Sequence, residues 1–150
     1  MRTGERGVAN RFSVAELLKI KLAAIVNVYI RDITELTNIN VEAETQPALY
    51  VSWHGDIIDE SRRAGKSALV TDSWAIILAM PDTRPENTLQ AAGAIIQSLL
   101  VLLTDWIPPI SATEPIRAVG AFKLCSSPPP FYKEGYSFYT ILFSVNMSLN

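Results

Sequence analysis

The C-terminal stretch YSFYTILFSVNMSLN, residues 136–150, decides the fold of this chain. Every second residue from Tyr139 to Leu149 is apolar, and the residues between them are mostly polar, with Phe138 and Leu142 as exceptions. Successive side chains of an extended chain point to opposite faces, so this period of two predicts a strand with one buried face. The pattern continues almost to the last residue, and we therefore expect the chain to end inside a sheet.

The composition indicates one globular domain. A chain of 150 residues with 49% hydrophobic residues is large enough to bury a substantial core. The charged residues make up 19% of the chain, below the ~25% of a typical soluble chain. The net charge is −2, whereas proteins that bind duplex nucleic acid are usually cationic overall. The single cysteine, Cys125, excludes an internal disulfide and a thiolate-rich metal site.

Two further segments are informative, one without an apolar run and one that is mostly apolar. Residues 1–12 contain three arginines and no apolar run, so we expect a flexible N-terminal arm and not a secretion signal. The longest apolar run, Ala91–Leu103, is shorter than the roughly 20 residues that span a bilayer, and it predicts a buried core helix. We expect a soluble protein of a reducing compartment.

The first half of the chain predicts a helix and a hairpin. Ser13 followed by Glu16 matches a capping box, which predicts a helix from Val14 to about Tyr29, although the β-prone residues before position 31 leave its end open. Residues 48–58 and 67–80 predict two strands. The charged segment 59–66 between them predicts an exposed hairpin loop.

The second half predicts a helix and two further sheet segments. Thr83 and Glu86 form another capping box around Pro85, and the apolar residues that follow recur with a period of 3.6 until Pro108 and Pro109. Residues 116–125 predict a sheet segment with Gly120 as a bulge, and the prolines at 128–130 prevent regular pairing before the last strand.

The order of these elements is helix, two strands, helix, two strands. Without alternating crossover units, it predicts an α+β fold in which a mostly antiparallel β-sheet is covered on one face by two α-helices. We expect one domain over residues 13–150.

The sequence offers little for catalysis. His54 is the only histidine, and the carboxylates near it, Asp56, Asp59 and Glu60, are better interpreted as solvated groups than as metal ligands. No phosphate-binding glycine loop and no nucleophile elbow is present. We therefore expect no catalytic, cofactor-binding or metal-binding residues, no cofactor, and a protein that is not an enzyme.

Two groups of residues are candidates for contacts with partners. Arg62, Arg63 and Lys66 form a basic cluster at the predicted hairpin, which is either an ordinary solvated loop or a contact to a partner or to nucleic acid. The aromatic residues Phe131, Tyr132 and Tyr136 follow the proline turn. They either anchor an interface or cap the end of the core, and the sequence does not separate these alternatives.

The elements in their order resemble a known family. An amphipathic helix, PALYV at 47–51, a charged hairpin, WAIILA at 74–79, a long helix ending near Trp106, a segment at 116–124 and a terminal strand at 139–145 together resemble the tail terminator or tail-completion proteins of tailed bacteriophages, most closely those of Mu-like phages and prophages. The resemblance covers about residues 14–150 and includes no diagnostic motif.

The resemblance implies a virion protein without catalytic residues. Such a protein forms a homohexameric ring at the head-proximal end of the tail, stops polymerisation of the tail tube and offers the docking surface for the head. Its implied partners are copies of itself, the tail tube protein, a head-completion or connector protein and DNA passing through the channel, with no membrane. Assembly takes place in the cytoplasm of a bacterial host.

Three alternatives remain open at this point. One is a head–tail connector or another minor tail protein. The second is a small ligand-binding or RNA-binding α+β module, which needs exposed aromatic residues on the open sheet face, for which Tyr50, Trp53, Phe122 and Tyr136 are candidates. The third is a small enzyme with a metal at His54.

Overall fold

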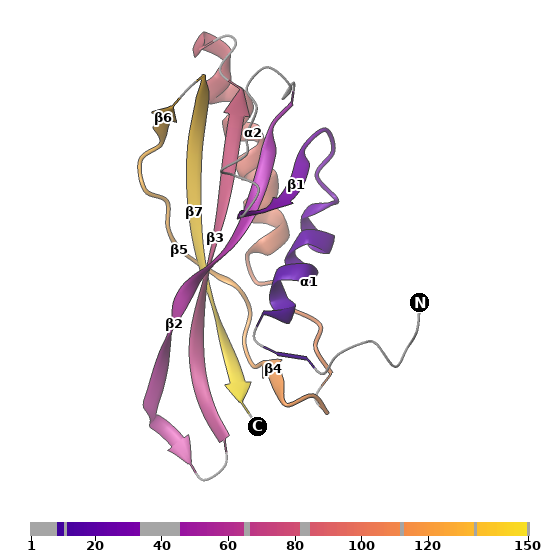
Figure 1. The fold of residues 1–150 in the computed structure, drawn as a ribbon, viewed down its shortest axis with the longest axis vertical. Coiled ribbons are helices and arrows are strands. Elements are labelled where there is room, and N and C mark those ends of the chain that lie inside the picture. Colours follow the sequence, from indigo (N-terminus) through magenta and orange to yellow (C-terminus); the bar gives the residue numbers. More distant parts are fainter. Residues whose placement is uncertain are drawn as a thin grey trace.

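The computed structural model describes residues 9–10, 12–33, 46–64, 67–81, 85–111, 113–133 and 135–149, with only the backbone described at 57–64, 67–68, 85–88 and 149. The helices are α1 (Ser13–Leu22) and α2 (Pro85–Leu103). The strands are β1 (Tyr29–Asp32), β2 (Ala48–Ala64), β3 (Ser67–Pro81), β4 (Ile116–Ala118), β5 (Lys123–Ser126), β6 (Phe131–Lys133) and β7 (Tyr136–Leu149) (Figure 1).

The strands of this described part form a single seven-stranded sheet, and β3 lies at its centre. Strand β3 pairs antiparallel with β2 on one side and with β7 on the other, in a continuous register from Ala68 opposite Leu149 to Pro81 opposite Tyr136. The short strands β4, β5 and β6 all pair with the outer edge of β7. Only β1 is parallel to its neighbour, β2. The predicted mostly antiparallel sheet is confirmed.

The main core lies between the two helices and one face of the sheet. Val14, Leu18 and Leu22 of α1 and Ala92, Leu99 and Leu103 of α2 are completely buried against the sheet. The sheet contributes the alternate residues that the sequence predicted, which are Val70, Trp74, Ile76, Leu78 and Met80 of β3 and Tyr139, Ile141, Phe143, Val145 and Met147 of β7. The helices therefore cover one face, as predicted.

The other face of the sheet has a smaller apolar cluster. Ala48 and Tyr50 of β2, Ala79 of β3, and Tyr136 and Phe138 of β7 are buried together there. Phe138, an exception to the polar side of the last strand, is explained by this second cluster. Farther along β7, Thr140, Ser144 and Asn146 of this face are polar and half-buried or exposed, whereas Leu142 is half-buried and Ser148 is buried.

The first helix is shorter than predicted, and its N-terminal interactions differ. It ends at Leu22, and Tyr29 begins a strand after Asn27, which adopts a left-handed φ of 62°. Ser13 is not the cap: no side chain caps this helix, and the Ser13 hydroxyl instead accepts a hydrogen bond from the Asn10 N–H at 2.9 Å. Residues 29–32 pair with β2, which agrees with the β-prone residues that left the end of the predicted helix open.

The predicted loop at residues 59–66 was wrong for most of its length. Strand β2 continues to Ala64, which pairs with Ser67 of β3, so β2 includes most of the predicted loop. The register shifts between Trp53 and Asp56, around Gly55 with a φ of 104°, a value that L side chains rarely adopt. A run of charged residues indicated solvent exposure but not the absence of strand pairing.

The predicted sheet segment 116–125 is divided into two strands. The Val119 N–H still donates to the Asn146 carbonyl of β7 at 2.9 Å, and the next residues turn toward the end of α2. There the Phe122 N–H donates to the Trp106 carbonyl at 2.8 Å, and the Asp105 N–H donates to the Phe122 carbonyl at 3.0 Å. These bonds tie the end of α2 to the sheet and bury Phe122 completely. The prolines at 128–130 lie outside regular pairing as predicted, and β6, which the sequence did not predict, follows them.

The two faces of β7 predict different costs for adjacent substitutions. Phe143 is completely buried under the helices, so Phe143→Ala should destabilise the protein by about 3–5 kcal/mol. Leu142 lies on the opposite face and is half-buried, so Leu142→Ala should cost less than half as much. Urea unfolding of both variants measures the difference, and equal losses would contradict the assignment of the faces.

Candidate functional site

The described residues offer no site for a metal ion. No group of three or more histidine, cysteine, aspartate or glutamate side chains comes together among them in a way that could hold a metal ion. His54 is exposed on β2, and the side chains of Asp59 and Glu60 are outside the described part of the chain. In the same part of the chain, no helix is long and apolar enough to cross a membrane. The candidate site must therefore be sought among the surfaces.

The most unusual surface is the exposed side of α2. No charged residue occurs between Glu86 and Asp105. Leu89, Gly93, Gln97 and Val101 recur every fourth residue and so form one row along the helix, and all four are exposed, Leu89 at 65% and Val101 at 72%. A side chain at Gly93 would meet nothing within 4 Å, so the row is open at its middle. Helix surfaces that face only water normally carry charges.

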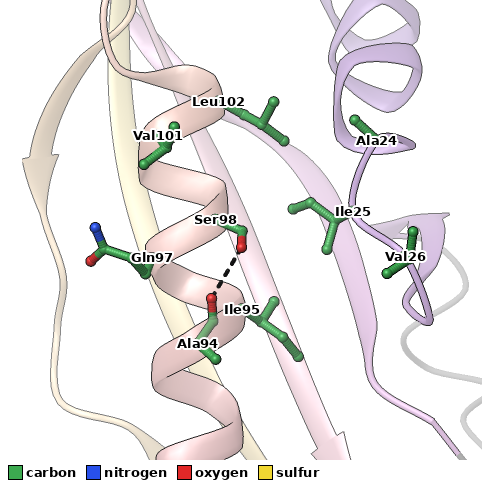
Figure 2. A pocket seen from close by; sticks show the side chains of 9 residues that line it. All are labelled: Ala24, Ile25, Val26, Ala94, Ile95, Gln97, Ser98, Val101 and Leu102. Atoms are coloured by element: carbon green, nitrogen blue, oxygen red, sulfur yellow. Dashed lines mark hydrogen bonds between the residues drawn. The ribbon is translucent and has the colours of Figure 1, made fainter.

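An apolar groove of about 500 Å³ runs beside this row (Figure 2). Its walls are α2 and the segment after α1, and its lining residues are Ala24, Ile25, Val26, Ala94, Ile95, Gln97, Ser98, Val101 and Leu102. Figure 2 shows Ile95 and Leu102 pointing toward Ile25 across the groove. The hydroxyl of Ser98 donates to the Ala94 carbonyl at 3.2 Å, which satisfies it within the helix. We call the row and the groove together the α2 surface.

The sequence contained a signal for this surface that the prediction did not use. The charge-free run was interpreted only as a core helix, although a helix on one face of a sheet exposes about half of its residues. Leu89 fits the 3.6-residue apolar period of this helix and is nevertheless exposed. The sequence does not predict the groove, because it predicts a helix that includes residues 24–26. In the structure α1 ends at Leu22, and these residues form one wall of the groove.

The aromatic residues after the proline turn are divided between surface and interior. Phe131 and Tyr132 of β6 are 51% and 65% exposed, whereas Tyr136 is 3% exposed in the second apolar cluster. The Phe131 ring stacks on Phe138 with centroids 4.9 Å apart, so one of its faces is held by the sheet. Phe131 lies opposite Phe138 and Tyr132 lies opposite Ser137, so the two side chains are on opposite faces at the outer edge of β7, and their contact with a partner stays a prediction.

The basic cluster is only partly described. The backbone of Arg62 and Arg63 belongs to β2, near the end of the long hairpin, and Lys66 lies outside the described residues. In Figure 1 this end of the β2–β3 hairpin extends well beyond α1 and α2. Its role in binding therefore also stays a prediction.

The outer edge of β2 is another candidate contact surface, because part of it pairs with no described strand. Strand β1 pairs with β2 only from Ala48 to Val51, and beyond Val51 no described strand pairs with this edge. Unpaired edges offer backbone donors and acceptors to a strand of another chain. The bulge at Gly55 divides the edge, so only its parts can pair regularly.

Electrostatic contacts close the junction between α1 and the sheet. The ammonium group of Lys19 lies 2.8 Å from the Glu16 carboxylate and 3.0 Å from that of Asp32 in β1. The hydrogen bonds to Glu16 and then to Asp32 raise the pKa of Lys19 above its ordinary value of 10.5. On the same face of the sheet, the carboxylate of Asp72 is completely buried and accepts a hydrogen bond from the Trp53 indole at 3.1 Å.

The RNA-binding alternative needs a surface of exposed aromatic rings, and the four candidate residues do not form one. Tyr50, Phe122 and Tyr136 are buried, and Trp53 is engaged by Asp72 and by an edge-on contact with Phe12. Bases stack on exposed rings, so these residues do not form such a platform.

The contact between Phe12 and Trp53 places the last residue of the expected N-terminal arm against the domain. Residues 1–8 and 11 of this arm lie outside the described part of the chain.

Comparisons with known proteins identify the family. A search of the curated proteins found no match. One of the matching solved structures aligns with 93% of this chain and 92% of its own length, at 11% identity and a TM-score of 0.42, which is too distant to carry an argument. The model of the phage tail terminator protein family matches residues 11–150, essentially the whole chain. The chain therefore belongs to the phage tail terminator family, a family of bacteriophage tail proteins.

Proposed function

We propose that this protein forms a homohexameric ring that caps the tail tube, stops its polymerisation and provides the surface on which the head docks. The protein acts at the head-proximal end of the virion tail, after assembly in the cytoplasm of the bacterial host. Its partners are copies of itself, the tail tube protein and a head-completion or connector protein. The membership in the tail terminator family supports this role.

The exposed, charge-free side of α2 is the observation that carries the proposal. Val101 and Leu89 expose apolar side chains to water in an isolated subunit, and contact with another protein surface would remove that apolar area from water. Charged residues are depleted at the centres of protein interfaces, as they are along this helix. The α2 surface is therefore one side of the proposed contact between subunits.

A closed ring needs a second, different surface. Head-to-tail contacts join two unlike surfaces of each subunit, and rotation closes them into a ring. Phe131 and Tyr132 on β6 offer exposed aromatic rings, which are enriched at interfaces. They belong to the strands along β7, whereas the α2 surface belongs to the helical layer. Two such surfaces on different layers suit a head-to-tail contact.

In the proposed role the protein catalyses no reaction. It caps the tail tube by blocking the addition of further tube subunits. The hairpin with Arg62, Arg63 and Lys66 remains a candidate contact to a partner or to DNA in the channel. A head–tail connector or another minor tail protein is the alternative role with the same surfaces.

A charge on the α2 surface should prevent assembly of the ring. Val101→Lys places an ammonium group in the proposed contact, and the cost of burying it unpaired should shift the protein to monomers at concentrations where the unchanged protein forms rings. Light scattering and negative-stain images measure the mass and shape. Thr113→Lys adds the same charge at an exposed turn and serves as the control. A Val101→Lys protein that assembles normally would exclude α2 from the contact.

The aromatic residues separate an interface role from a core role. Tyr132→Ser should leave the melting temperature nearly unchanged, because the ring is 65% exposed, but it should weaken assembly or binding to tail tubes by about tenfold or more. Tyr136→Ser should lower the melting temperature by several degrees, because its ring is buried. Thermal unfolding and co-sedimentation with tubes measure the two effects. Normal assembly of Tyr132→Ser would remove this residue from the interface.

A further inference from the structure

The charged side chains of the sheet are sorted between its two faces. Residues that lie directly opposite each other on paired strands share a face. Arg117 lies opposite Ser148, Lys123 opposite Ser144, and Lys133 opposite Tyr136. These three residues of β7 are even-numbered, and the odd-numbered ones, from Tyr139 to Met147, face the helices. The three cations therefore lie on the face that the helices leave open.

The acidic residues follow the opposite rule. Asp72 of β3 lies opposite Val145, a residue of the helix-covered core, and Asp56 lies opposite Asp72. Asp32 lies opposite Val51 of the same core and binds Lys19 of α1. Among the described side chains of the sheet, the carboxylates are thus on the helix-covered face, and the open face carries cations, including Arg31 opposite Tyr50.

The open face changes character along the row of cations. Near Arg117 and Lys123 its residues are small and polar, and Thr71, Ser73, Ser144 and Asn146 are all half-buried or exposed. The Thr71 hydroxyl donates to the Asn146 amide oxygen at 2.9 Å, so part of this surface is already hydrogen-bonded within the sheet. Toward Lys133 the face is apolar, with Leu142, Ile77 and the cluster that includes Phe138.

The cations form a row along one strand. Their partners in β7 are residues 136, 144 and 148, and at ~3.3 Å per residue the row extends over at most about 40 Å. This length is close to one turn of duplex DNA, ~34–36 Å. Lys123 and Lys133 are exposed, and Arg117 is half-buried. In Figure 1, β5 and β6 run along the side of β7 that lies away from α1.

We propose that the open face of the sheet, with Arg117, Lys123 and Lys133, is the surface that contacts the phosphate backbone of duplex DNA. The contact is electrostatic and independent of base sequence, because cations that meet phosphates carry no base information. Three widely spaced cations hold a duplex weakly and permit it to slide, unlike a dense basic patch. The inference deepens the proposed ring function, since it assigns this face to the channel, but the charge sorting is a property of the single subunit.

The test is binding of a fluorescent 25-base-pair duplex of random sequence, measured by anisotropy at about 20 mM salt. The unchanged protein should bind, and its affinity should fall steeply as salt is added. The triple variant Arg117→Gln, Lys123→Gln, Lys133→Gln should weaken binding by at least about tenfold and flatten the salt dependence, since each lost phosphate contact removes roughly 0.9 from the slope of log affinity against log salt. Lys21→Gln, on α1, is the control and should change neither quantity.

Other outcomes would overturn the inference. They are no binding by the unchanged protein at this salt, equal binding by the triple variant, and an equal loss in the Lys21→Gln control. Thermal unfolding and light scattering accompany each measurement. A triple variant that keeps its DNA affinity but no longer forms rings, or no longer binds a tail protein, would assign the face to a protein contact instead. A subunit that binds DNA through this face but never forms rings would instead reject the ring and keep the DNA surface.

Discussion

The continuous pairing of β3 with β7 is the interaction on which the rest of the structure depends. It joins the middle of the chain to its last strand, without a shift from Ala68 opposite Leu149 to Pro81 opposite Tyr136. Because the side-chain period is two, one step of slippage would turn the core residues of β7 toward the open face. The unbroken register thus fixes which residues meet the helices, where the short strands β4–β6 attach, and which charges share a face.

Two surfaces of different character result from this arrangement. The helical layer presents a charge-free α2 surface with an apolar groove, which suits a permanent protein contact. The open face of the sheet presents hydroxyl groups and a row of cations, which suits a transient contact with a polyanion. The ring that we propose would use both kinds of surface, because its neighbouring subunits must stay in place while the contents of the channel pass. The low overall charge of the chain is compatible with this division, since the sorting is local.

Polar contacts join the helical layer to the sheet and connect β2 with β3. Asp72 accepts from Trp53, and Trp53 packs against Phe12 just before α1. Lys19 joins Asp32 of β1 to Glu16 of the same helix. Exposed ion pairs of this kind contribute little to stability, but they fix the orientation of α1 relative to the edge of the sheet. The groove beside Ile25 depends on that orientation.

The sequence by itself determined the α+β class, the long strands β3 and β7, and the helix α2. In each of these elements a periodicity of two or 3.6 residues continues over many positions. Short elements were decided by tertiary contacts. Residues 29–32 and 131–133 became strands because β2 and β7 offer them an edge. The mostly charged residues 59–64 belong to β2 because β3 lies beside them, with Asp59 and Ala64 both paired to it. The sorting of Arg117, Lys123 and Lys133 onto one face was equally invisible in the sequence. A register is a relation between segments far apart in the chain, and local patterns do not contain it.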